Sequence, residues 1–134
     1  MNTNNLIVGL ALAQFVFFGV MVGRARGKYG IAAPATTGNE MFERYFRVQM
    51  NTMELLVAFV PALYAFSAYY SSSYVALLGT SFLVGRFVYF YSYVKDPKSR
   101  GLGFALSMIP VMALIVGTVA RSEEHTSELQ SRGL

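Results

Sequence analysis

Arg47, Asn51 and Glu54 are spaced by four and three residues at the point where a long apolar segment begins. In a helix of 3.6 residues per turn, this spacing places the three side chains on one face. A guanidinium binds carboxylates, a side-chain amide both donates and accepts, and a carboxylate accepts from an ammonium or amide group. The row therefore suits a zwitterionic, peptide-like ligand. An internal ladder of ion pairs is the alternative, in which Glu43 pairs with Arg47 and Glu54 pairs with Arg86.

A second polar set lies in the next apolar segment, where Arg86, Tyr89 and Tyr93 share one helical face. A charge inside such a segment is costly in a membrane and requires a partner. Taken alone, the tyrosines are better explained as an aromatic belt at the membrane interface. After a turn that contains Pro97 comes Arg100, which is either a membrane anchor or a fixed positive charge that stabilises an anion.

The elements that carry these residues are apolar blocks long enough to cross a membrane. Hydrophobic residues make up 54% of the 134-residue chain and charged residues 13%, whereas about a quarter of a soluble domain is charged. Because roughly 20 apolar residues span a bilayer core, we predict an all-α integral membrane protein, a bundle of four spanning helices. Their expected ranges are 5–23, 43–69, 73–95 and 102–120.

The basic residues predict the orientation of these helices. They flank the first and third expected connections, whereas the N-terminal residues and the turn at Ser71–Ser73 have none. By the positive-inside rule, the first and third connections face the cytoplasm and both termini lie on the opposite side. Anchoring and an anionic ligand explain the net charge of +4, so we expect no nucleic-acid partner.

Residues 121–134 break abruptly with the composition of the preceding chain. They are polar, contain the single histidine, His125, and resemble the translation of a sequencing adapter. We therefore interpret residues 1–120 as the transmembrane domain and 121–134 as a non-native tail, with an ordinary polar C-terminal tail as the alternative. The chain has no cysteine and no histidine outside this tail, so we expect no thiolate or histidine metal site and no protein thiol as nucleophile.

The segments around the candidate residues resemble the MAPEG family, the membrane-associated proteins in eicosanoid and glutathione metabolism. The resemblance rests on Pro34–Gly38, on Phe42–Glu54, and on Gly85 through Phe104 with the tyrosines and Arg100 between them. It covers residues 5–120 and is strongest for the branch of microsomal glutathione transferases and leukotriene C4 synthase. It implies a homotrimer of four-helix subunits, with glutathione bound between neighbouring subunits near the cytoplasmic face.

The resemblance also assigns roles by position. Arg100 matches the arginine thought to stabilise the glutathione thiolate, and it is therefore the expected catalytic residue. The glutathione-binding residues that the resemblance implies are Arg26, Arg47, Gln49, Asn51, Glu54, Tyr89 and Tyr93. One departure is Leu55, which stands where the family often has an aromatic residue and weakens one expected contact.

These implications define an expected function and two alternatives. The expected protein is a membrane glutathione transferase, a glutathione-dependent peroxidase or both, acting on lipophilic electrophiles or lipid hydroperoxides that enter from the membrane lipid. A non-enzymatic lipid-binding member of the same family is the first alternative, although the complete set with Arg100 argues against it. The second is a small multidrug transporter, which would place an acid at mid-membrane in its first helix, where this chain offers only Gln14.

Overall fold

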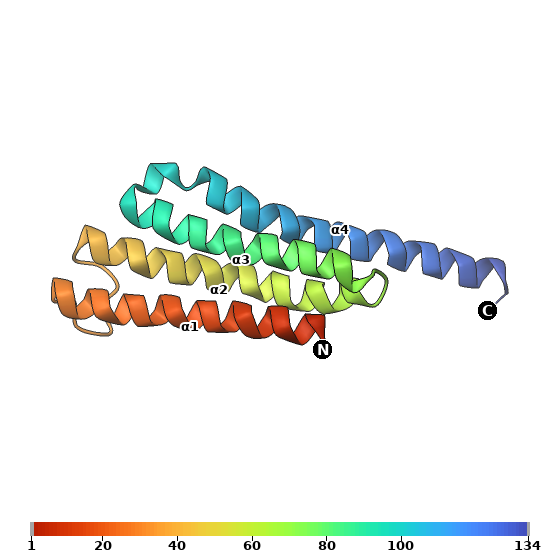
Figure 1. Cartoon of the computed structure of the whole chain (residues 1–134), viewed down its shortest axis with the longest axis horizontal. Helices are drawn as coiled ribbons and strands as arrows, with labels where there is room; N and C mark the ends of the chain where they lie inside the picture. Colours follow the sequence, from red (N-terminus) through yellow and green to blue (C-terminus); the bar gives the residue numbers. More distant parts are fainter. Residues whose placement is uncertain (1, 134) are drawn as a thin grey trace.

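Four long helices, each antiparallel to the next, make up the computed structural model of the chain, which describes residues 2–133 (Figure 1). They are α1 (Thr3–Tyr29), α2 (Glu40–Ser67), α3 (Ser72–Lys95) and α4 (Gly101–Ser131), and a short 3₁₀ helix, η1 (Pro97–Ser99), precedes α4. Each long helix is long and apolar enough to cross a membrane. The predicted all-α class with four spanning helices is confirmed.

The first helix is longer than its apolar block. It continues from the expected end at residue 23 to Tyr29, because the basic residues that follow the block are good helix formers and favour the negative end of the helix dipole. It ends at Gly30, whose φ of 69° is a left-handed conformation typical of a helix C-cap. The first membrane-flanking charges are therefore held on a rigid helix.

The last helix is also longer than expected. It runs through the polar segment to Ser131 and projects beyond the bundle (Figure 1). The change in composition at residue 121 therefore marks the end of the apolar block and not the end of the helix. The non-native origin of residues 121–134 stays a prediction.

The bundle has an apolar interior and an apolar exterior. The rings of Phe59 and Phe82 stack at its centre, with 3.9 Å between their centroids. Large apolar residues also cover the outside, among them Val57, Leu77 and Ile109, which are 72%, 67% and 66% exposed. Since a soluble domain rarely presents such a surface, this exterior matches the hydrocarbon core of a bilayer.

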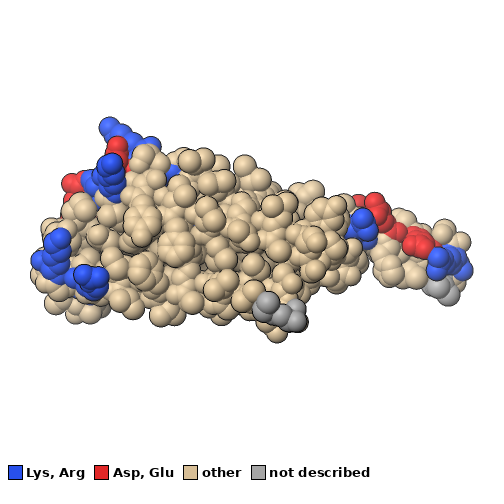
Figure 2. Space-filling view, viewed as in Figure 1, with Lys and Arg blue, Asp and Glu red and all other residues tan. Residues whose placement is uncertain are grey.

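Charged side chains gather at the end of the bundle that carries the α1–α2 and α3–α4 connections. Figure 2 shows lysines and arginines at this end and an uncharged central face. We refer to it below as the basic end. The candidate residues Arg47 and Arg100 belong to it, since α2 starts there at Glu40 and α4 starts there at Gly101.

Helices α3 and α4 approach each other closely next to the basic end. A Cβ added to Gly103 of α4 would lie 2.3 Å from the backbone nitrogen of Tyr89, and one added to Gly85 of α3 would lie 2.7 Å from that of Ser107. Only glycine fits at such contacts. The start of α4 is thereby fixed against Tyr89 of α3.

Candidate functional site

One pocket at the basic end brings together residues from three helices. It has a volume of about 340 Å³ and is lined by Arg47 and Asn51 of α2, Tyr89 of α3, and Arg100 and Phe104 at the start of α4. Four of these five belong to the set predicted from the sequence. Phe104 lies one helical turn after Arg100 and adds an aromatic surface beside that guanidinium.

The row on α2 is held by an ion pair between its first and last members. Arg47 Nη1 lies 3.1 Å from Glu54 Oε1, and the two side chains are 49% and 54% exposed. Glu43 instead accepts a hydrogen bond from the backbone nitrogen of Gly38 at 3.3 Å. The alternative pairings, Glu43 with Arg47 and Glu54 with Arg86, are therefore wrong. Arg47 pairs with Glu54, and Arg86 forms hydrogen bonds to uncharged side chains.

Arg86 is completely buried and connects three helices beneath the pocket. Its Nη1 donates to Asn51 Oδ1 at 2.7 Å and to Thr52 Oγ1 at 3.2 Å, and its Nε donates to Ser107 Oγ at 2.9 Å. Its guanidinium carbon also lies 4.4 Å from the ring centroid of Tyr89. Since the oxygen of Asn51 is occupied by Arg86, the amide N–H groups of Asn51 remain to donate to a ligand.

The two predicted tyrosines of α3 stack on each other. The ring centroids of Tyr89 and Tyr93 are 5.4 Å apart, with an interplanar angle of 17°. Tyr89 is buried and lines the pocket, whereas Tyr93 supports it from one turn closer to the basic end. The stack therefore forms one rigid aromatic wall.

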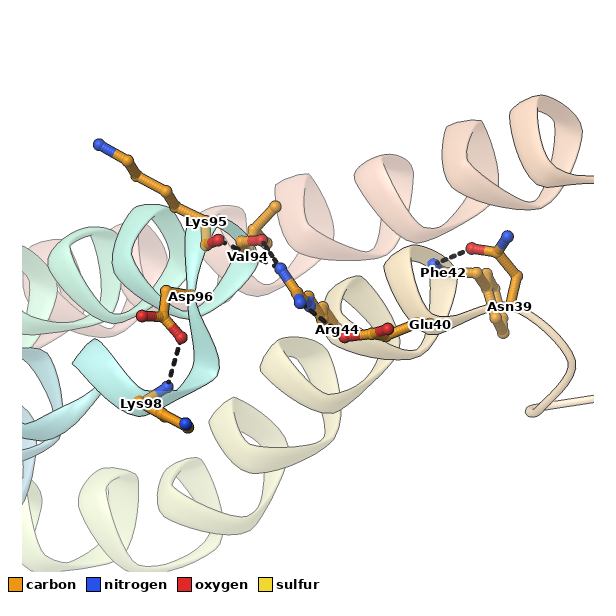
Figure 3. A network of polar contacts seen from close by, with 8 residues as sticks. All are labelled: Asn39, Glu40, Phe42, Arg44, Val94, Lys95, Asp96 and Lys98. Carbon is orange, nitrogen blue, oxygen red and sulfur yellow. Dashed lines mark hydrogen bonds and ion pairs between the residues drawn. The ribbon is translucent and has the colours of Figure 1, made fainter.

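A tight turn positions Arg100. Helix α3 ends at Lys95, as Pro97 predicts, and Asp96 Oδ1 accepts a hydrogen bond from the backbone nitrogen of Lys98 at 3.1 Å (Figure 3). Ser99 Oγ then donates to the backbone oxygen of Ser92 at 2.9 Å. This folds the turn back onto α3 and places Arg100 directly before α4.

Arg44 fixes the end of α3 to α2, a role that was not predicted. Its Nη1 donates to the backbone oxygens of Val94 and Lys95 at 2.9 and 3.1 Å, and its Nη2 lies 2.7 Å from Glu40 Oε1 (Figure 3). The spacing of Glu40 and Arg44 indicates an ion pair within one helix. It gives no sign that the same guanidinium caps another helix, which depends on the tertiary arrangement.

Arg26 and Gln49, which were also predicted to bind glutathione, do not line the pocket of their own subunit. Arg26 Nη1 donates to the backbone oxygen of Ala35 at 2.6 Å, and its guanidinium carbon lies 4.8 Å from the centroid of Phe42. The amide of Gln49 faces α1, where a Cβ on Gly19 would lie 2.8 Å from Gln49 Nε2. Gln49 is two positions from Arg47, and residues so spaced point to different sides of a helix.

Comparison with known proteins places the chain in a family. The profile of the MAPEG family matches residues 5–120, which include every residue that lines the pocket. The chain belongs to the MAPEG family. This confirms the resemblance seen in the sequence, and with the four apolar helices it establishes an integral membrane protein.

Several relatives of this MAPEG chain are close in sequence. An uncharacterized protein of Synechocystis is 45% identical over 114 residues, which are 85% of this chain and 83% of the relative. Human microsomal glutathione S-transferase 2 is 37% identical over 106 residues, or 79% and 71% of the two chains. Leukotriene C4 synthase of Cavia porcellus is 33% identical over 84 residues, or 63% and 56%.

Leu55 occupies the core of this MAPEG chain and not the pocket. It is 7% exposed and belongs to the central apolar cluster with Leu56 and Phe59. The departure from the aromatic pattern of the family therefore leaves the polar lining of the pocket unchanged.

Proposed function

We propose that this MAPEG protein is a glutathione transferase that uses the pocket at the basic end to bind glutathione and activate its thiol. The observation that carries this proposal is the meeting of Arg47, Asn51, Tyr89 and Arg100 in one pocket of about 340 Å³. Relatives named as glutathione transferases over most of the chain support the choice of ligand. Within residues 2–133 the lining of this pocket has two guanidinium groups and no carboxylate, which suits the carboxylates of the peptide, and Glu54 lies next to Arg47 outside the lining.

The chemistry of the pocket matches that of a small acidic peptide. Glutathione carries two carboxylates, one ammonium and two amides. Arg47 is a bidentate donor for a carboxylate, and Glu54 beside it can accept from the ammonium. Asn51 offers its amide N–H groups, because its oxygen is held by Arg86. Tyr89 forms the aromatic wall against which the peptide lies.

A neighbouring copy of the chain completes this site in our proposal. The pocket opens at the surface of the bundle, and half of the Arg47 side chain is exposed. Arg26 and Gln49 lie on another side of the same subunit, near α1. In a homotrimer, the face with Arg26 and Gln49 of one copy would lie over the pocket of the next.

The proposed reaction starts with the thiol of glutathione, because the chain has no cysteine of its own. A free thiol has a pKa of about 8.5 and is mostly protonated at neutral pH. The guanidinium of Arg100 beside the sulfur favours the thiolate by lowering the pKa of that thiol. The thiolate sulfur then forms a bond to an electrophilic carbon, and the leaving group departs with the electron pair of the broken bond.

A lipid hydroperoxide can react at the same sulfur. The thiolate attacks the terminal peroxide oxygen, the O–O bond breaks, and the lipid leaves as an alcohol after taking up a proton. The oxidised glutathione is then a sulfenic acid, which condenses with a second glutathione to a disulfide and water. The exposed ring of Phe104 beside Arg100 provides an apolar approach from the bilayer for either second substrate.

The basic end faces the cytoplasm in this proposal. The positive-inside rule supports this orientation, since most of the lysines and arginines gather at the end with the α1–α2 and α3–α4 connections (Figure 2). Glutathione would then enter from the aqueous side, and the lipophilic substrate from the adjacent leaflet.

An activity assay on purified protein tests the proposal. In detergent or lipid nanodiscs, the protein should conjugate glutathione to chlorodinitrobenzene or reduce a lipid hydroperoxide at the expense of glutathione. The same preparation with Arg100→Ala is the matched control for contaminating transferases. Activity that is absent from the wild type, or equal in both proteins, would reject the proposed function.

A further inference from the structure

A second hollow surface lies along α1, on residues that the glutathione pocket does not use. Between α1 and α3 is an apolar hollow of about 400 Å³, lined by Leu10, Ala13, Gln14, Phe17, Leu83 and Phe87. Its floor is fixed, because Gln14 Nε2 donates to the backbone oxygen of Leu83 at 2.8 Å. The hollow is open to the outside of the bundle at membrane depth.

A basic hollow lies farther along the same helix. It measures about 160 Å³ and is lined by Met21, Arg24, Ala25, Lys28, Tyr29 and Tyr45. Arg24 and Lys28 are exposed, one helical turn apart, and neither forms an ion pair within residues 2–133. The hollow therefore offers two cations and two tyrosines, with no carboxylate in its lining.

The two hollows lie one after the other along the same face of α1, and we refer to them together as the groove. Their α1 residues recur every three or four positions, as Leu10, Gln14, Phe17, Met21, Arg24 and Lys28, which places them on one helical face. The buried ring of Phe90 packs beneath one residue of each hollow. Its centroid lies 6.0 Å from that of Phe17 in the apolar hollow and 5.9 Å from that of Tyr45 in the basic one.

The length of this groove matches one leaflet of a membrane. From Gln14 to Arg24 there are ten steps of about 1.5 Å, or roughly 15 Å along the helix. Half of a hydrocarbon core of about 30 Å is the same length. With Arg24 at the level of the headgroups, the apolar hollow lies where the acyl chains of that leaflet run.

We propose that this groove is a binding site for one anionic phospholipid of the leaflet at the basic end. The phosphate lies between Arg24 and Lys28, Tyr29 and Tyr45 contact the headgroup and glycerol region, and an acyl chain follows Met21 and Phe17 into the apolar hollow. A phospholipid has its anionic phosphate at one end and its acyl chains at the other. This matches the groove, which has its cations at one end and its apolar surface at the other. The site is independent of the proposed glutathione chemistry.

Native mass spectrometry tests this assignment. The protein is reconstituted in nanodiscs with equal parts of phosphatidylglycerol and phosphatidylcholine, extracted in mild detergent, and the retained lipids are counted. We expect the wild type to retain one phosphatidylglycerol per chain, with a preference of about 30-fold over phosphatidylcholine from the two cations. Retention of neither lipid, or of both equally, would overturn the proposal.

Two matched pairs of variants locate the site. Arg24→Gln with Lys28→Gln should abolish the preference, whereas Lys95→Gln with Lys98→Gln, which removes two exposed charges from the same end, should keep it. Ala13→Phe should fill the apolar hollow and lower retention, whereas Leu12→Phe on the neighbouring exposed face should not. If both members of either pair behaved alike, the lipid would not occupy this groove.

Discussion

Asn51 of α2 and Arg86 of α3 are joined by a hydrogen bond of 2.7 Å between the amide oxygen of Asn51 and Nη1 of Arg86. The bond connects a residue in the lining of the pocket to a fully buried charge behind it. It fixes which end of the Asn51 amide faces the ligand. The orientation of this ligand-facing residue therefore depends on a residue that does not line the pocket.

Replacing Arg86 should impair both stability and glutathione binding. Arg86→Met leaves the oxygens of Asn51, Thr52 and Ser107 without their donor, and each unsatisfied buried group costs about 1–3 kcal/mol. We expect a lower thermal unfolding temperature in detergent and roughly tenfold weaker glutathione binding, because Asn51 loses its orientation. Lys98→Met, which removes an exposed charge, is the control. Unchanged binding in a folded Arg86→Met protein would show that Asn51 is oriented by other contacts.

Replacing Arg100 should separate chemistry from binding. We expect Arg100→Ala to lower kcat by about 100-fold or more, the effect of losing one donor to a developing anion, while glutathione still binds. The ultraviolet absorbance of the bound thiolate should disappear at neutral pH, because the pKa of the thiol returns towards about 8.5. A variant that kept the thiolate absorbance would place the activating group elsewhere.

The close contact of α4 with Tyr89 provides a test of how Arg100 is positioned. A Cβ at Gly103 would lie 2.3 Å from the backbone nitrogen of Tyr89, whereas one at Gly101 would meet nothing within 4 Å. Gly103→Ala should therefore push the start of α4 away from α3 and lower kcat. Gly101→Ala makes the same chemical change two residues earlier and should leave kcat unchanged. Equal activities would mean that the position of α4 does not govern the reaction.

Replacing Arg44 should affect kcat more than the KM for glutathione. Arg44→Gln removes the donor to the backbone oxygens at the end of α3 and loosens the turn before Arg100 (Figure 3). We expect kcat to fall by several-fold with a smaller change in the KM for glutathione, since Arg47 and Asn51 remain in place. Glu40→Gln removes one ion-pair partner of Arg44, an exposed carboxylate, but keeps both hydrogen bonds from Arg44 to the end of α3, and should be close to wild type.

The sequence predicted the helices well because their signals are local. Apolar blocks and basic flanks are sufficient to place four spanning segments, and Pro97 correctly placed the end of α3. The helix ends beyond the membrane were missed, because residues 24–29 and 121–131 are polar but still favour helix. Hydropathy marks where a helix leaves the bilayer and not where its hydrogen bonds stop.

The partners of charged residues were harder to predict. The sequence showed that Arg86 needs a partner, but pairing by opposite charge suggested Glu54, whereas the structure supplies an amide and two hydroxyls. Ser107 lies on another helix, and nothing in the sequence places it beside Arg86. The roles of Arg26 and Gln49 depend on a second copy of the chain, so they stay predictions.

Binding of glutathione to the purified protein is the decisive measurement for the pocket at the basic end. Titration calorimetry on the wild type should show saturable binding. Arg47→Ala should weaken it by about tenfold or more, because Arg47 is the carboxylate donor of the pocket and Glu54 would lose its ion-pair partner. Glu40→Gln, at an exposed position on the same helix, should bind like the wild type. Absence of saturable glutathione binding to the intact protein would show that this pocket is not a glutathione site.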